Sequence, residues 1–114
     1  YIWHRDHRIA GQVTIDAVFP YARDHLAYPE LLEEDLQPHK VKEMLFWASE
    51  DINYLSDITA TFDLKLAALR CHESQVKSMK VSDLENWLRQ RCSDLAEGED
   101  FDLAEAFHRE EIVW

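Results

Sequence analysis

The chain has 114 residues, and its 12 basic and 23 acidic side chains give a formal net charge of 12 − 23 = −11. This length corresponds to one small domain or to part of a larger one. Such negative charge repels phosphate backbones and anionic lipid surfaces, so we expect no nucleic-acid partner. A hydrophobic content of 46% is too high for a disordered tail. Because no apolar run approaches the ~20 residues of a membrane span, we also expect no such span.

Two cysteines, Cys71 and Cys92, lack the CxxC spacing of a thiolate metal site and make no disulfide framework. Both fall on predicted apolar helix faces, where a reduced, buried thiol is the common state. The sequence therefore favours a reducing compartment, and we expect a cytoplasmic protein.

The first element is predicted to be a helix from His7 to about Asp24, with Asp6 as its N-cap and Pro20 ending or kinking its last turn. An acidic connector follows over residues 27–42, with one short helical turn around residues 30–34.

Two short strands are predicted next, over residues 43–48 and 52–58. The first is apolar on both faces, with Met44 and Phe46 on one and Leu45 and Trp47 on the other. This pattern is typical of a strand covered on both sides, as in parallel α/β sheets, and it places Trp47 in the core.

The second half is predicted to contain two helices and a strand. Thr59 is the expected N-cap of a helix that runs to about Val76. A capping box, with Ser82 at the N-cap and Glu85 at N3, opens the next helix, which Gly98 ends. Residues 101–113 could form a strand or a short helix, and we favour the strand. The order α-β-β-α-α-β indicates the α/β class.

Chemically useful side chains are concentrated at His4-Arg5-Asp6-His7. Imidazoles three residues apart can converge on one ion, or one can bind metal while the other acts as an acid. A carboxylate between them can orient an imidazole. The alternative is a chance string in which Asp6 caps a helix and both histidines are solvated.

The other histidines carry weaker signals. His25, His39 and His108 lie in charged surroundings and are expected to be solvated. His72 closes a predicted helix, where the helix dipole favours it.

The string HRDHRIAG, from His4 to Gly11, resembles the H-P-D-H-R-x-x-G motif of the PIG-L/LmbE-like family of zinc-dependent N-acetylglucosaminyl deacetylases. It departs from the common form at Arg5, where proline is usual. Further segments are similar to the same family in the same order: Phe19 to Asp24, Pro29 to Leu31, Pro38 to Val41, Asp57 to Thr59, Phe62 to Lys65, His72-x-Ser74-Gln75 and Ala104 to Phe107.

The resemblance implies that residues 1–114 are the C-terminal part of a single LmbE-like deacetylase domain, a Rossmann-like three-layer sandwich. The family's first motif, A-H-P-D-D-x-E, is absent from the 114 residues. It supplies two zinc ligands and the general base, which we expect upstream of Tyr1. The resemblance makes His7 the third Zn²⁺ ligand. His4 would then stabilise the oxyanion, Asp6 would orient the His4 imidazole, and His72 would lie on the substrate side.

The implied function is zinc-dependent hydrolysis of the acetyl amide of an N-acetylglucosamine-type conjugate by a longer parent protein, the fragment alone being inactive. Its partner would be an N-acetylated amino-sugar conjugate, and the family commonly forms homo-oligomers. Two alternatives stay open. One is a catalytically inactive LmbE-like domain for carbohydrate binding or oligomerisation, and the other is a short protein that completes its site with a partner chain.

Overall fold

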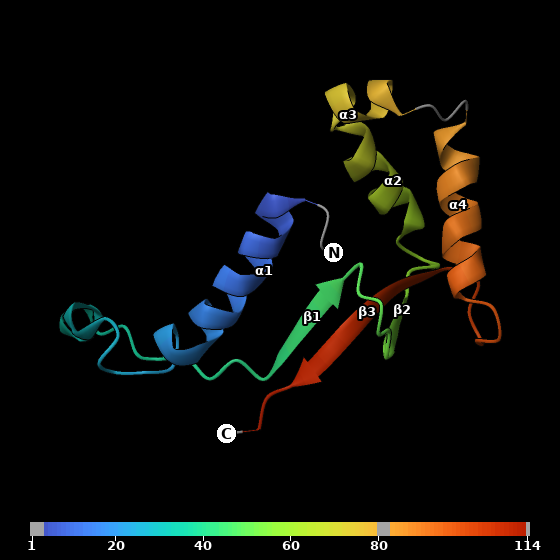
Figure 1. The fold of residues 1–114 in the computed structure, drawn as a ribbon. Helices are drawn as coiled ribbons and strands as arrows, with labels where there is room; N and C mark the ends of the chain where they lie inside the picture. Colours follow the sequence, from blue (N-terminus) through green and yellow to red (C-terminus); the bar gives the residue numbers. More distant parts are fainter. Residues whose placement is uncertain (1–3, 80–82, 114) are drawn as a thin grey trace. The chain divides into compact units, whose positions relative to one another are not determined.

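The computed structural model describes residues 4–79 and 83–113. The chain divides into two compact units, one made of residues 1–51 and 108–114 and the other of residues 52–107 (Figure 1). We describe each unit by itself.

The first unit begins with helix α1, Arg5–Asp16, which continues into a π-helical segment η1, Ala17–Tyr21. The predicted helix from His7 to Asp24 is therefore shorter at its C-terminal end and starts two residues earlier. Phe19 leaves helical geometry at φ −147° and ψ 125°, because the residue before a proline is sterically driven out of the α region. The predicted break at Pro20 is confirmed. A 3-10 helix η2, Pro29–Glu34, confirms the short helical turn in the connector.

Three strands form a sheet in the order β1-β3-β2: β1 is Glu43–Trp47, β2 is Tyr54–Asp57 and β3 is Ala104–Glu111. The last strand confirms the preference for a strand over a helix near the C-terminus. In the second unit, β2 pairs antiparallel with the first half of β3, from Tyr54 opposite Phe107 to Asp57 opposite Ala104. In the first unit, β1 runs against the second half of β3 (Figure 1).

The parallel, doubly covered arrangement predicted for residues 43–48 is therefore wrong in the described structure. Half-buried and exposed residues alternate along β1, so that Met44 and Phe46 are half-buried while Leu45 and Trp47 are exposed. Alternation is the pattern of an antiparallel sheet with one face in water. A mixture of helices and an antiparallel sheet agrees with the α/β class at a coarse level.

The second unit contains helices α2, Phe62–Arg70, α3, Glu73–Ser78, and α4, Leu84–Leu95. The single helix predicted from Thr59 to Val76 is two helices, since α2 ends before Cys71 and His72. The N-cap of α2 is Thr61. The predicted N-cap of the next helix, Ser82, lies outside the described residues. The N-cap of α4 is Asp83, whose carboxylate accepts the backbone N–H of Asn86 at 3.1 Å.

The hydrophobic core lies in this second unit and joins α2, α4 and the segments next to the sheet. Phe62 is its largest fully buried side chain, at 1% exposure. Leu69, Leu84 and Trp87 pack against the buried cluster, which consists of Ile58, Phe62, Leu66, Leu88, Cys92 and Leu103. The predicted apolar faces of both helices are thus confirmed, including the burial of Cys92. The predicted burial of Cys71 is wrong: it is exposed, because the helical repeat places it on the side of α2 opposite Phe62.

Thr59 has a different role from the predicted helix cap. Its hydroxyl oxygen accepts the backbone N–H groups of Asp102 and Leu103, both at 3.2 Å, and so fixes the approach to β3. The backbone N–H of Thr59 donates to the Asp57 carboxylate at 2.9 Å. Hydrogen bonds from the Thr59 side chain and backbone lower the pKa of Asp57. This network ties the end of β2 to the start of β3.

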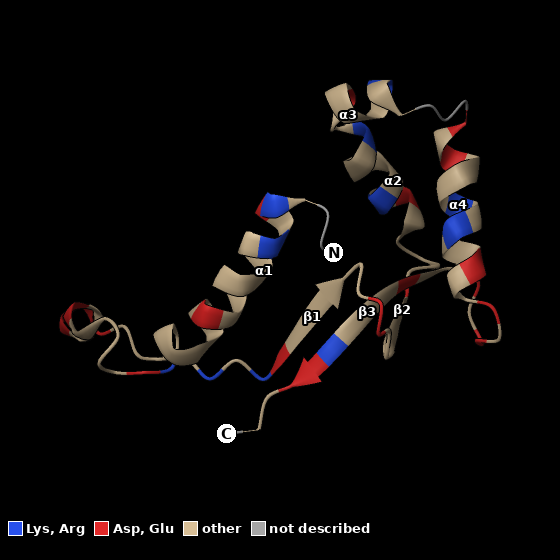
Figure 2. Ribbon diagram, viewed as in Figure 1, with Lys and Arg blue, Asp and Glu red and all other residues tan. Residues whose placement is uncertain are grey.

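Acidic side chains occur in both units, on η2, in the loop after α4 and at the end of β3 (Figure 2). Across the described residues, no helix is long and apolar enough to cross a membrane.

His108 holds the loop after β1 to the second half of β3. The side chain is 21% exposed. Nδ1 contacts the carbonyl oxygen of Asp51 and Nε2 contacts a carboxylate oxygen of Glu110, both at 2.7 Å. Two acceptors require a donor on each ring nitrogen, which is the protonated imidazole. The Glu110 carboxylate, followed by the Asp51 carbonyl, raises the pKa of His108. The solvated position predicted for this residue is wrong, because β3 extends through it.

Replacing Phe62 with alanine should destabilise the second unit by about 3–5 kcal/mol, the usual cost of deleting a fully buried aromatic side chain. Leu64→Ala in the same helix is the control, since Leu64 is 71% exposed, and it should change the free energy of unfolding by less than about 0.5 kcal/mol. Urea unfolding followed by circular dichroism measures both. Equal effects of the two substitutions would contradict the assigned core.

Replacing His108 with glutamine should remove part of the pH dependence of stability. Because the folded pKa is raised, the imidazolium contacts stabilise the fold fully below the unfolded value of about 6.5. That contribution is lost as pH rises through the folded pKa. Urea unfolding between about pH 6 and pH 9 should show the loss in the native chain and not in the variant. His39→Gln controls for replacing an exposed histidine. An NMR titration midpoint of His108 below the unfolded value would refute the assignment.

Candidate functional site

The histidines of the HRDH string lie together at the N-terminus of α1. His4 is the N-cap, and its Nδ1 accepts the backbone N–H of Asp6 at 3.2 Å. His7 lies in the first turn, and the centroids of the two imidazole rings are 4.8 Å apart with a tilt of 36°. Both residues are exposed. The N-cap predicted at Asp6 is therefore wrong, since the imidazole of His4 occupies that role.

Asp6 contacts His4 through its backbone rather than through its carboxylate. The carboxylate accepts a hydrogen bond from Nε of Arg5 at 3.2 Å. The His4 ring is thus held by the first turn of the helix itself. An Nδ1 that accepts a hydrogen bond places the proton of the neutral imidazole on Nε2. The Nε2–H group is then a hydrogen-bond donor.

Trp47, at the end of β1, contacts His7 from a different element of the same unit. The two ring centroids are 5.3 Å apart and the rings meet at 63°, which is an edge-to-face arrangement. The Trp47 side chain is 61% exposed, so the core position predicted for it is wrong. The sequence carried a signal for this exposure, because Leu45 and Trp47 alternate with Met44 and Phe46 and so share one face of the strand. In an antiparallel sheet one face commonly lies in water.

A groove runs between α1 and β1 beside these rings and encloses about 770 Å³. Its polar side chains include Arg8, Gln12 and Ser49, and its apolar side chains include Ile15 and Phe46. His7 and Trp47 both line this groove. The site therefore combines an imidazole, an exposed aromatic ring and hydrogen-bonding groups.

A tetrahedral catalytic zinc site takes three protein ligands and keeps one open position. Imidazole nitrogen is a donor that zinc prefers, so His7 fits the role of one ligand. Among residues 4–79 and 83–113, no group of three His, Cys, Asp or Glu side chains could hold a metal ion. These residues can supply part of a zinc site and do not form a complete one.

His72 belongs to the other compact unit. It is exposed and occupies the N-cap position of α3, two residues after the end of α2, with no capping hydrogen bond from its side chain. His72 was predicted to close a helix. It lies instead at the junction where α2 has ended and α3 begins. Of the predicted site residues, the structure brings together His4, Asp6 and His7.

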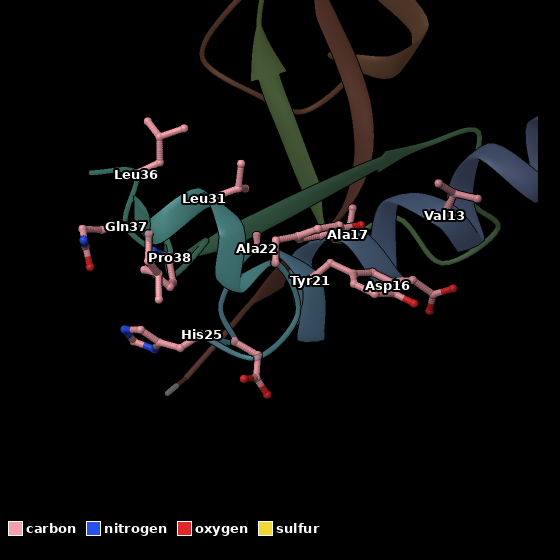
Figure 3. Close-up of a pocket in the computed structure, with 13 residues that line it drawn as sticks. Val13, Asp16, Ala17, Tyr21, Ala22, His25, Leu31, Leu36, Gln37 and Pro38 are labelled. Carbon is pink, nitrogen blue, oxygen red and sulfur yellow. The ribbon is translucent and has the colours of Figure 1, made fainter. Parts of the chain in front are cut away.

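A second cavity in the first unit, of about 520 Å³, lies among the end of α1, η1 and η2. Figure 3 shows Val13, Ala17 and Tyr21 on one part of its lining and Leu31, Leu36 and Pro38 on another. The Tyr21 and Tyr28 rings lie 5.8 Å apart there. The wall is mostly apolar, and His25 is the one imidazole among its lining residues.

Over 75 residues the chain is 36% identical to a diacetylchitobiose deacetylase of Thermococcus kodakarensis. The match covers 66% of this chain and 28% of the relative, so the chain spans little more than a quarter of that enzyme's length. No protein-family model matches the chain, and no solved structure matches it. The similarity indicates a relationship to deacetylases.

Substituting His4 should separate its capping role from its chemical one. His4→Ala should destabilise α1 by about 1 kcal/mol, because the N–H of Asp6 loses its acceptor. His4→Asn should restore that stability, since asparagine is among the best N-cap residues. Hydrogen exchange of the α1 amides measures the difference. Equal exchange in the alanine and asparagine variants would show that His4 does not cap the helix.

Proposed function

We propose that this chain forms part of a zinc-dependent deacetylase that hydrolyses the acetyl amide of an N-acetylglucosamine-type conjugate. The observation that carries the proposal is the pairing of His4 and His7 at the start of α1, in the string that resembles the second motif of the PIG-L/LmbE-like family. The similarity to a diacetylchitobiose deacetylase supports the same reaction class and an amino-sugar substrate.

His7 is proposed as one zinc ligand, with the remaining ligands supplied by another part of the complete protein. When bound, zinc supplies an activated water for attack on the acetyl carbonyl. His7 lies within the first helical turn, and Trp47 packs against its ring. These two constraints restrict the directions in which the imidazole can present a nitrogen.

His4 is proposed as the donor to the oxygen that gains negative charge during attack. Its Nδ1 is engaged by the N–H of Asp6, so Nε2–H is the donor available to the substrate. A cap bond keeps this donor in place before the reaction, which is the preorganisation that makes oxyanion donors effective. The contact with the Asp6 backbone is thereby a positioning interaction for His4.

In the longest natural polypeptide that contains this chain, His7→Ala should lose zinc and turnover together. His4→Asp should keep both zinc and the α1 helix, because aspartate is among the best N-cap residues. Its carboxylate has no hydrogen to donate, so turnover should fall by ~10²–10³, the usual cost of an absent oxyanion donor. His39→Ala, at an exposed position of the same unit, should change neither property. Zinc is measured by elemental analysis and turnover by acetate release from N,N'-diacetylchitobiose.

Three results would contradict the proposal. Zinc retained at full stoichiometry in His7→Ala would remove His7 from the ligand set. Full turnover in His4→Asp would remove its role as a donor. A native protein that binds N,N'-diacetylchitobiose and releases no acetate would favour the inactive carbohydrate-binding alternative.

A further inference from the structure

We propose that Trp47 is a specificity-determining residue on which a pyranose ring of the substrate stacks, next to the imidazole of His7. This inference rests on the proposed deacetylase function and extends it to the residue that selects a sugar. Trp47 lies outside the HRDH string, at the end of a strand that begins 36 residues after His7 (43 − 7).

The exposure of Trp47 is the first observation. Its 61% exposure leaves most of a large indole ring in water. Aromatic side chains contribute most to stability when they are buried, and Trp47 is exposed. The indole meets the imidazole of His7 edge to face, with the ring centroids 5.3 Å apart.

The location of Trp47 is the second observation. The ring lines the same groove as His7, together with Arg8, Gln12 and Ser49. A pyranose ring has an apolar face of C–H bonds and an edge of hydroxyl groups. The indole matches the apolar face, and the three polar side chains match the hydroxyl edge. Ligand sites of this kind combine apolar or aromatic walls with a small number of polar groups.

The contact between Trp47 and His7 connects binding to reaction. A sugar ring stacked on the indole lies next to an imidazole that touches the same indole, so a substituent on that sugar is carried toward the His4 and His7 pair. Leu26 belongs to the same unit and is 84% exposed. It is not among the residues that line this groove, so it is the comparison for removing an exposed apolar side chain.

The test uses the longest natural polypeptide that contains this chain, with N,N'-diacetylchitobiose as the probe. Trp47→Ala should weaken binding of this probe by ~10-fold or more, which corresponds to about 1.4 kcal/mol. Trp47→Phe should recover most of the affinity, because a smaller aromatic ring still stacks. Leu26→Ala should stay within about twofold of the native protein. Calorimetric titration measures affinity, and elemental analysis measures zinc in each variant.

A loss of sugar affinity with zinc retained in Trp47→Ala, and recovery in Trp47→Phe, would support the stacking role. Unchanged affinity in Trp47→Ala, while His7→Ala loses zinc and turnover, would overturn this inference and leave the proposed function intact. Loss of zinc in both Trp47 variants would overturn it too, by making Trp47 a packing residue for His7. A native protein that binds neither zinc nor the disaccharide would overturn the proposed function and this inference with it.

Discussion

Strand β3 is the element on which the rest of the structure depends. Its first half pairs with β2 and begins at Ala104, which is 0% exposed beside the core. Its second half lies beside β1, where Nε of Arg109 donates to the Glu43 carboxylate at 2.7 Å and the N–H of Ile112 donates to the carbonyl of Lys42 at 2.8 Å. Eight consecutive residues thus satisfy backbone groups of both neighbouring strands, and each unit uses its own half of the strand.

Stability is distributed unevenly between the two units. Every hydrophobic residue found fully buried in the described chain belongs to the second unit, around Phe62. In the first unit, Ile9 and Val13 of α1 are each more than half exposed. The helix that carries the histidine pair is therefore held by its cap, by ring contacts and by partial burial. Elements with few buried apolar contacts open at low free-energy cost, and functional segments are commonly drawn from them.

Sequence patterns predicted the elements well where apolar periodicity was strong. The apolar faces of α2 and α4 placed Phe62, Leu88 and Cys92 in the core, and both strands near residues 43–58 were located. The predicted first residue of an element was wrong where a single hydrogen bond decides at which residue that element begins. His4 replaces Asp6 as the cap of α1, because an imidazole nitrogen can accept the same N–H. The pairing of β1 was also wrong, since apolar residues on both faces do not distinguish a covered strand from an edge strand.

The candidate site was predicted in part. Spacing along the chain brought His4, Asp6 and His7 into one helical turn, whereas the contribution of Trp47 depends on a contact between β1 and α1 that no local pattern encodes. The zinc role of His7 and the substrate role of His72 remain predictions.

The cap at His4 has a consequence for the divergence of related chains. The His4 side chain caps the helix through Nδ1 and, in the proposed reaction, donates a hydrogen bond to the substrate through Nε2. Aspartate can replace the capping role but not the donor role, because it is a good N-cap residue whose carboxylate has no hydrogen to donate. A lineage that has lost the reaction could therefore carry aspartate at this position while its helix stays intact. A lineage still under selection for the reaction would keep a side chain that both caps and donates, so the residue type at this position would separate the two histories.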